Sequence, residues 1–103
     1  PKDGPSAGTA ITVAIYSLIN NKKIKNDIAI TGEINLQGMV TEIGGLELKI
    51  LGGIKAGVTS FIHPHSNIKD FNKFLEKYKD LDISNITFYP VKHISEVLEL
   101  VFI

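Results

Sequence analysis

Hydrophobic positions recur along the chain with two periods, one typical of helices and one typical of short buried strands. Between residues 7 and 20 they follow helical spacing and predict a helix, with Ser6 as its N-cap and Asn20-Asn21 as its exit. The apolar residues on this spacing are Ala10, Ile11, Ala14, Ile15, Leu18 and Ile19.

The next part of the chain predicts two strands. Residues 27–31, which end before Gly32, and residues 38–43, which begin at Gly38, are short and apolar, as buried strands usually are. The segment from Glu33 to Gln37 between them predicts that the two strands form a hairpin. Further patterns predict helices over 46–56, 68–78 and 95–102 and strands over 58–63 and 85–91. Pro64 stops the first of these later strands, and Ser66 or Asn67 can cap the helix that follows.

Strands that alternate with helices predict an α/β fold, a layered sheet with parallel pairings and packed helices. No repeat, low-complexity tract or linker divides the sequence, so residues 1–103 read as one unit. A chain of 103 residues with 44% hydrophobic content can hold a single core.

Composition excludes several functional classes. The 11 basic residues are all Lys and balance 11 acidic ones, which makes nucleic acid a poor candidate partner. The absence of Cys excludes a disulfide framework, a thiolate nucleophile and a zinc–thiolate site. No apolar run approaches the roughly 18 residues of a membrane span, so no membrane partner is expected.

Ser6 is the first candidate for chemistry. It follows a Gly-Pro turn at a predicted helix start, where unpaired N–H groups and the positive end of the helix dipole come together. A serine there can act as a nucleophile beside an oxyanion hole. Two alternatives stay open: Ser6 is simply an N-cap, or Gly4–Thr9 is a phosphate-binding turn, although it lacks the lysine and spacing of a nucleotide-binding loop.

A nucleophilic serine needs a base, and Lys49 is the best placed candidate. A helical wheel sets it beside Leu46, Ile50 and the Gly52-Gly53 pair, where loss of solvation would favour a neutral amine. The alternative is an exposed lysine whose stem covers apolar surface.

The three histidines have simpler explanations. His63 and His65 flank Pro64 and could share a metal ion, but two ligands without a third are a weak signal. His93 precedes the last predicted helix and fits a surface residue or a cap.

Several motifs occur in a fixed order: Pro1-Lys-Asp-Gly-Pro-Ser-Ala-Gly8, Thr31-Gly-Glu33, Gly38, and Ile43-Gly-Gly45 followed by Lys49. Together they resemble the proteolytic domain of the Lon family of ATP-dependent proteases, and the first motif is highly specific. The similarity runs to the last helix. It implies that residues 1–103 are the C-terminal part of a larger proteolytic domain, whose N-terminal strands are missing from this sequence.

The resemblance implies a serine endopeptidase with a Ser-Lys catalytic dyad. Ser6 corresponds to the family nucleophile and Lys49 to its general base. Thr31 matches a position that hydrogen-bonds the catalytic lysine. Asp3 and Glu33 match acidic positions near the site, with a regulatory or structural role.

The resemblance also implies a homo-oligomer, a hexamer at full length, that degrades unfolded or misfolded proteins in the cytoplasm or in a mitochondrial matrix. ATP and Mg would serve an unfoldase part outside residues 1–103. Within residues 1–103 no cofactor or metal site is expected.

The sequence departs from the family pattern at Glu47-Leu48, usually a charged pair, and at His63, usually aliphatic. Two other functions stay open: an assembly fragment without catalytic competence, and a phosphate-binding module.

Overall fold

The computed structural model of the chain describes residues 5–103, and the side chains from residue 8 on. The helices in this range are α1 (Pro5–Asn20), α2 (Leu46–Lys55), α3 (Ile68–Lys77) and α4 (Ile94–Val101). The strands are β1 (Ile28–Ile30), β2 (Glu33–Ile34), β3 (Val40–Thr41), β4 (Ser60–Pro64) and β5 (Thr87–Val91), and a 3-10 turn, η1 (His65–Asn67), joins β4 to α3.

Three of the strands form a parallel sheet in the order β1-β4-β5. Parallel neighbours need crossover connections, and α2 and α3 lie in the two crossovers. The α/β class with parallel pairings is therefore confirmed.

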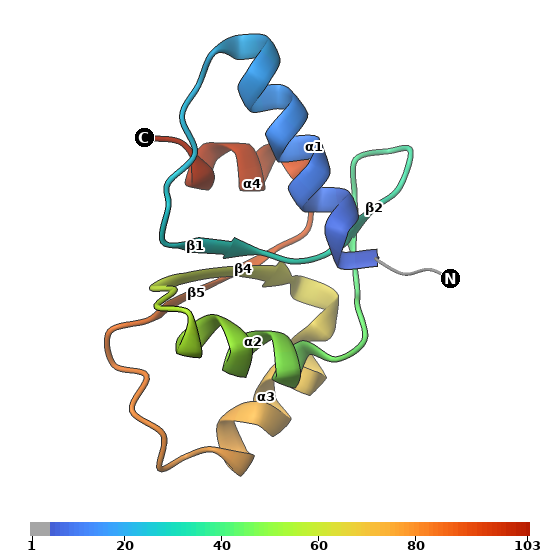
Figure 1. Cartoon of the computed structure of the whole chain (residues 1–103). Helices are drawn as coiled ribbons and strands as arrows, with labels where there is room; N and C mark the ends of the chain where they lie inside the picture. Colours follow the sequence, from blue (N-terminus) through green and yellow to red (C-terminus); the bar gives the residue numbers. More distant parts are fainter. Residues whose placement is uncertain (1–4) are drawn as a thin grey trace.

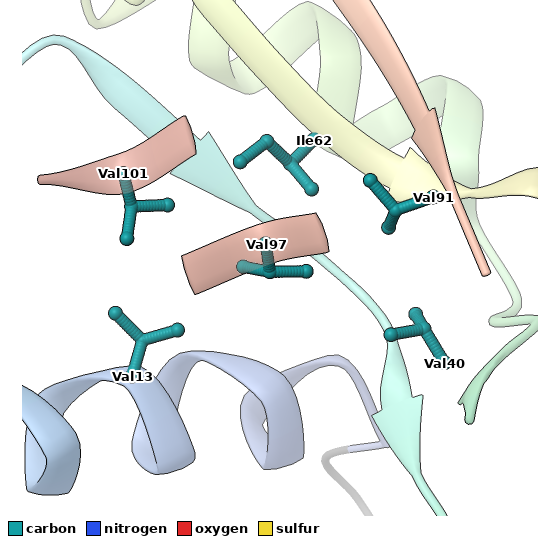
Figure 2. Close-up of a cluster of buried hydrophobic side chains, with 6 residues drawn as sticks. All are labelled: Val13, Val40, Ile62, Val91, Val97 and Val101. Carbon is teal, nitrogen blue, oxygen red and sulfur yellow. The ribbon is translucent and has the colours of Figure 1, made fainter. Parts of the chain in front are cut away.

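Helices cover both faces of this sheet: α1 and α4 lie on one side and α2 and α3 on the other (Figure 1). Successive residues of a strand point to opposite faces, so β4 contributes Ile62 to one core and Phe61 to the other. Figure 2 shows the core beneath α1 and α4, which consists of Val13, Val40, Ile62, Val91, Val97 and Val101. The second core consists of Ile43, Leu46, Ile50, Phe61 and Phe74.

The expected hairpin between residues 27–31 and 38–43 is wrong. β1 pairs in parallel with β4, and β3 pairs instead with β2, which lies in the segment expected to be the turn. The chain changes direction at Gly32, whose φ of +128° favours glycine. A Cβ at Gly32 would also lie only 2.6 Å from the Cγ1 of Val40. The apolar pattern of residues 27–31 identified a strand but carried no information on its partner.

Several element boundaries differ from expectation by one or more residues, and two of them involve prolines. α1 begins at Pro5, so Ser6 is the second residue of the helix and not its N-cap. Proline suits a first helical position because its fixed φ is helical and its missing N–H would have no partner there. Pro64 ends β4, paired with Val91, instead of lying after the strand.

The paired glycines of α2 give a sharp test of packing on the second core. A Cβ on Gly53 would lie 2.2 Å from the Cζ of the buried Phe61, whereas a Cβ on Gly52 meets nothing within 4 Å. We expect Gly52→Ala to raise the free energy of unfolding by about 1 kcal/mol through helix propensity. Gly53→Ala should lower it by about 1–3 kcal/mol, because the overpacked Phe61 ring must move.

Urea denaturation of the two variants beside the parent chain checks both signs. Equal effects of the two substitutions would contradict the close approach of α2 to Phe61.

Candidate active site

Ser6, Thr31 and Lys49 lie in segments toward the carboxyl ends of the parallel strands. In Figure 1, α1 and α2 both begin on the side to which the arrows of β1 and β4 point, on opposite faces of the sheet. Ser6 lies in the first turn of α1, Lys49 in the first turns of α2, and Thr31 directly after β1. The fold therefore brings the backbone of these three positions to one side of the molecule.

Thr9 fastens the start of α1 to the chain just after β1. It is fully buried, and both its backbone N–H (3.1 Å) and its hydroxyl (2.6 Å) donate to the carbonyl oxygen of Gly32. Ser6 lies three residues earlier in the same helix, so the Thr9–Gly32 contact sets where the Ser6 backbone lies relative to β1. Sequence reasoning missed Thr9 because only apolar positions were counted, although it shares the helix face of Val13.

Thr31 is buried, with 5% of its surface exposed. Its N–H and its hydroxyl both donate to the carbonyl oxygen of Ile62 on β4, each at 3.0 Å. Because the hydroxyl proton is already engaged, the lone pairs of the Thr31 oxygen remain to accept a further hydrogen bond. Thr31 is thus oriented as an acceptor at the end of β1.

Lys49 does not have the buried environment expected from the helical wheel. α2 packs through Leu46 and Ile50, and Gly53 adjoins Phe61, so Lys49 falls at the flank of the buried stripe and its side chain is exposed. Within residues 8–103 no hydrogen bond joins the Lys49 amine to Thr31. The backbone of Lys49 is firmly placed, since its N–H donates to the carbonyl of Gly45 at 3.1 Å.

The acidic candidates are not part of a described cluster. Glu33 begins β2 with an exposed side chain, while its backbone carbonyl accepts from the Thr41 hydroxyl at 3.1 Å. Asp3 lies outside the described residues, and so does the side chain of Ser6.

His93 has the simpler of the roles expected for it. His93 is the N-cap of α4, because its Nδ1 accepts from the N–H of Ser95 at 3.1 Å. In the described part of the chain, no group of three or more His, Asp or Glu residues is arranged to hold a metal ion. Over the same residues, every helix is too short or too polar to cross a lipid bilayer.

Comparison with known proteins identifies the family to which this chain belongs. The sequence model of the Lon protease (S16) C-terminal proteolytic domain matches residues 1–103. The chain is 46% identical over 100 residues to the Lon protease of Dictyoglomus thermophilum and 43% identical over 100 residues to that of Flavobacterium johnsoniae. It is 45% identical over 100 residues to the Lon protease of Buchnera aphidicola. Each match covers 97% of this chain and 12% of the relative's length.

The chain therefore belongs to the Lon (S16) family of proteases, and the resemblance seen in its motifs is confirmed. Its α/β fold, with a parallel sheet between packed helices, agrees with this assignment.

His63, one of the departures from the family pattern, lies at the carboxyl end of β4 with 1% of its surface exposed. Its ring stacks on Phe71, with 4.8 Å between ring centroids, and meets Phe88 edge-on at 6.4 Å. Its Nδ1 is 3.3 Å from the carbonyl of Pro64, and its buried Nε2 has no partner among the described residues. Burial lowers the pKa of His63, opposed by the contact with the Pro64 carbonyl and aided by the nearby charge of His65.

This burial predicts a pH-dependent loss of stability. An unfolded histidine takes up a proton below about pH 6.5, whereas folded His63 with its lowered pKa stays neutral to a lower pH. The unfolded state then binds more protons, so the free energy of unfolding falls as pH drops below about 6.5, by at most about 1.4 kcal/mol per pH unit. We expect His63→Leu to flatten this dependence in urea titrations between pH 7 and pH 5.

His65→Gln is the matched control, because it removes the exposed imidazole two residues away. It should keep most of the pH slope. A His63→Leu variant with the parent slope would show that another group is responsible.

Proposed function

We propose that this chain carries the Ser-Lys dyad of a serine endopeptidase, with Ser6 as nucleophile and Lys49 as general base. The observation that carries the proposal is that the first turn of α1, the end of β1 and the first turns of α2 all lie toward the carboxyl ends of the parallel strands. The match to the Lon proteolytic domain over residues 1–103 supports the same assignment.

In this mechanism the neutral amine of Lys49 takes the proton of the Ser6 hydroxyl, and the serine oxygen attacks the carbonyl carbon of the scissile peptide bond. Backbone N–H groups at the start of α1 have no partner within the helix, and they stabilise the oxyanion that develops. The ammonium of Lys49 then protonates the leaving amine, which departs and leaves an acyl-enzyme. Water, activated by the same lysine, hydrolyses the ester and restores Ser6.

Thr31 would orient the base. Its hydroxyl proton is engaged by the Ile62 carbonyl, so its oxygen can accept one N–H of the Lys49 amine and leave the amine lone pair directed at Ser6. A hydroxyl does this without the negative charge that would favour a protonated lysine. For that reason Asp3 and Glu33 are assigned a regulatory or structural role.

We extend the proposal to the protein as a whole, because its relatives named Lon protease are far longer than this chain. Residues 1–103 would form the C-terminal part of a proteolytic domain in a homo-oligomer, a hexamer at full length, in the cytoplasm or a mitochondrial matrix. Its substrates would be unfolded or misfolded proteins, delivered by an unfoldase that uses ATP and Mg outside this chain.

A second candidate function is assembly without catalysis. The outer face of α1 is apolar, with 52–82% of each side chain exposed at Ile11, Ile15, Leu18 and Ile19. Exposed apolar faces of this kind often mark interfaces. A peptidase assay on the isolated 103 residues separates the two functions, since turnover that depends on Ser6 rejects a purely assembling role. A phosphate-binding module would instead require saturable nucleotide binding that is lost on substitution of Gly4 or Gly8.

The dyad predicts complete loss of peptidase activity when either member is removed. In the full-length protein, Ser6→Ala should lose the nucleophile and Lys49→Ala the base, with a fall in kcat of at least about 1,000-fold for each. The rate of release of a fluorescent group from a short peptide measures this effect. Far-ultraviolet circular dichroism should show that both variants remain folded.

Lys55→Ala is the matched control, because Lys55 is another exposed lysine of α2 and lies in its last turn. Its activity should equal that of the parent protein. A Lys49→Ala protein that cleaves at the parental rate would exclude Lys49 as the base.

We expect substitution of Thr31 to have a smaller effect on the rate of the same reaction. Thr31→Val keeps the shape of the side chain but removes the acceptor oxygen, so we expect kcat to fall by about 10–100-fold while KM changes little. Thr31→Ser, which keeps the hydroxyl, should retain most of the activity. Equal rates for the Val and Ser variants would contradict a role for this oxygen.

A further inference from the structure

Asn67 is a buried amide whose hydrogen bonds reach across the fold. It lies in η1 with 2% of its surface exposed. Its Oδ1 accepts from the N–H of Ile43 and its Nδ2 donates to the carbonyl of Ile43, both at 2.9 Å. Nδ2 also donates to the carboxylate of Asp70 at 2.9 Å. The oxygen and both N–H donors of the amide are therefore engaged.

The Asn67 side chain does not cap the helix that follows it. Asn67 precedes α3, where a cap would bond the first N–H groups of the helix, but it makes no such bond. Its amide instead pairs with both backbone groups of Ile43, 24 residues earlier, in the manner of a neighbouring strand. The expected capping role of Asn67 is wrong, and the amide serves the segment between β3 and α2.

That segment leads directly to Lys49. Ile43 is followed by Gly44 and Gly45, and α2 begins at Leu46. Gly45 has a φ of +72°, and an added Cβ on either glycine would meet nothing within 4 Å. Two glycines without packed neighbours give the backbone wide freedom, so this turn must be fixed from its ends. Leu46 fixes one end in the second core, and Ile43, at the other end, packs in the same core and has its backbone held by the Asn67 amide.

Two further polar contacts join Glu47, in the first turn of α2, to the C-terminal end of α3. The hydroxyl of Tyr78 donates to Glu47 Oε2 at 2.7 Å, and the ammonium of Lys77 lies 3.1 Å from the same oxygen. These two contacts lower the pKa of Glu47, with the Tyr78 hydrogen bond as the larger cause. Exposed ion pairs of this kind contribute little to stability. The buried Asn67–Ile43 pair is therefore the stronger polar restraint on how α2 starts.

We propose that Asn67 is a positioning residue for Lys49: by holding both backbone groups of Ile43, its amide fixes the Gly44-Gly45 turn and with it the first turn of α2. This inference rests on the proposed dyad. Asn67 touches neither substrate nor reacting atoms and acts only through the placement of the helix that carries the base.

Asn67→Ala in the full-length protein tests the inference. It leaves the N–H and the carbonyl of Ile43 without their partner, and a misplaced base slows the chemical step more than it weakens substrate binding. We expect kcat for peptide cleavage to fall by about 10–100-fold, with KM within about twofold of the parent value. Measurements are made well below the melting temperature of each variant.

Val97→Ala is the matched control for lost stability, because Val97 is fully buried in the core on the opposite side of the sheet. It should lower the melting temperature but leave kcat unchanged. Asp70→Asn removes the carboxylate that accepts from Asn67 while the pair with Ile43 remains, and should also keep the parental kcat.

Asn67→Asp covers the case in which the alanine variant does not fold. It has the same size and still accepts from the Ile43 N–H, but it cannot donate to the Ile43 carbonyl. Its kcat should fall as well. If both folded Asn67 variants match Val97→Ala in kcat while Lys49→Ala is inactive, the positioning role is wrong and the dyad stands. If Lys49→Ala is itself fully active, the proposed function fails first.

Discussion

The pairing of β4 with both of its neighbours is the constraint on which the rest of the structure depends. β4 lies between β1 and β5, and its successive residues Phe61 and Ile62 enter opposite cores. Its Ile62 carbonyl also accepts both donors of Thr31. A parallel sheet must be covered on both faces, and in this fold α1 and α2 begin on opposite faces toward the carboxyl ends of the strands. The residues of the proposed site come from the starts of these two helices and from the end of β1.

Polar contacts outside the sheet then fix the positions of α1 and α2 relative to the sheet. Thr9 bonds α1 to Gly32, and Asn67 holds the residue from which the chain turns into α2. Both are buried side chains bonded to backbone groups of a distant segment, which costs little because each buried polar group finds a partner. Apolar packing alone would tolerate small sliding and rotation of α1 and α2, whereas hydrogen bonds to the backbone of one residue, Gly32 or Ile43, allow much less.

Much of this fold was predictable from the sequence, and the exceptions share a physical cause. The spacing of apolar residues placed the helices α1 to α4 to within a few residues and identified the three strands of the parallel sheet. It could do so because an element that buries one face repeats its apolar residues with the period of that element. The partner of β1 was not predictable, since a short apolar strand fits a hairpin and a parallel sheet equally well. The roles of Thr9 and Asn67 were missed for a similar reason: a buried polar residue reveals its function only through the distant carbonyl or N–H it bonds. The roles of Ser6 and Lys49 rest on motifs, not on periodicity.

A lysine base has two separate requirements, a fixed position and exclusion of water, and this chain meets them unequally. The start of α2 is held by the Asn67 amide and by Leu46 in the core, so the backbone of Lys49 is well placed. Its side chain is exposed over the described residues. In the proposed dyad, water around this amine would have to be excluded by groups other than those that the described residues place against it, because a dry site strengthens the electrostatic interactions on which the reaction depends.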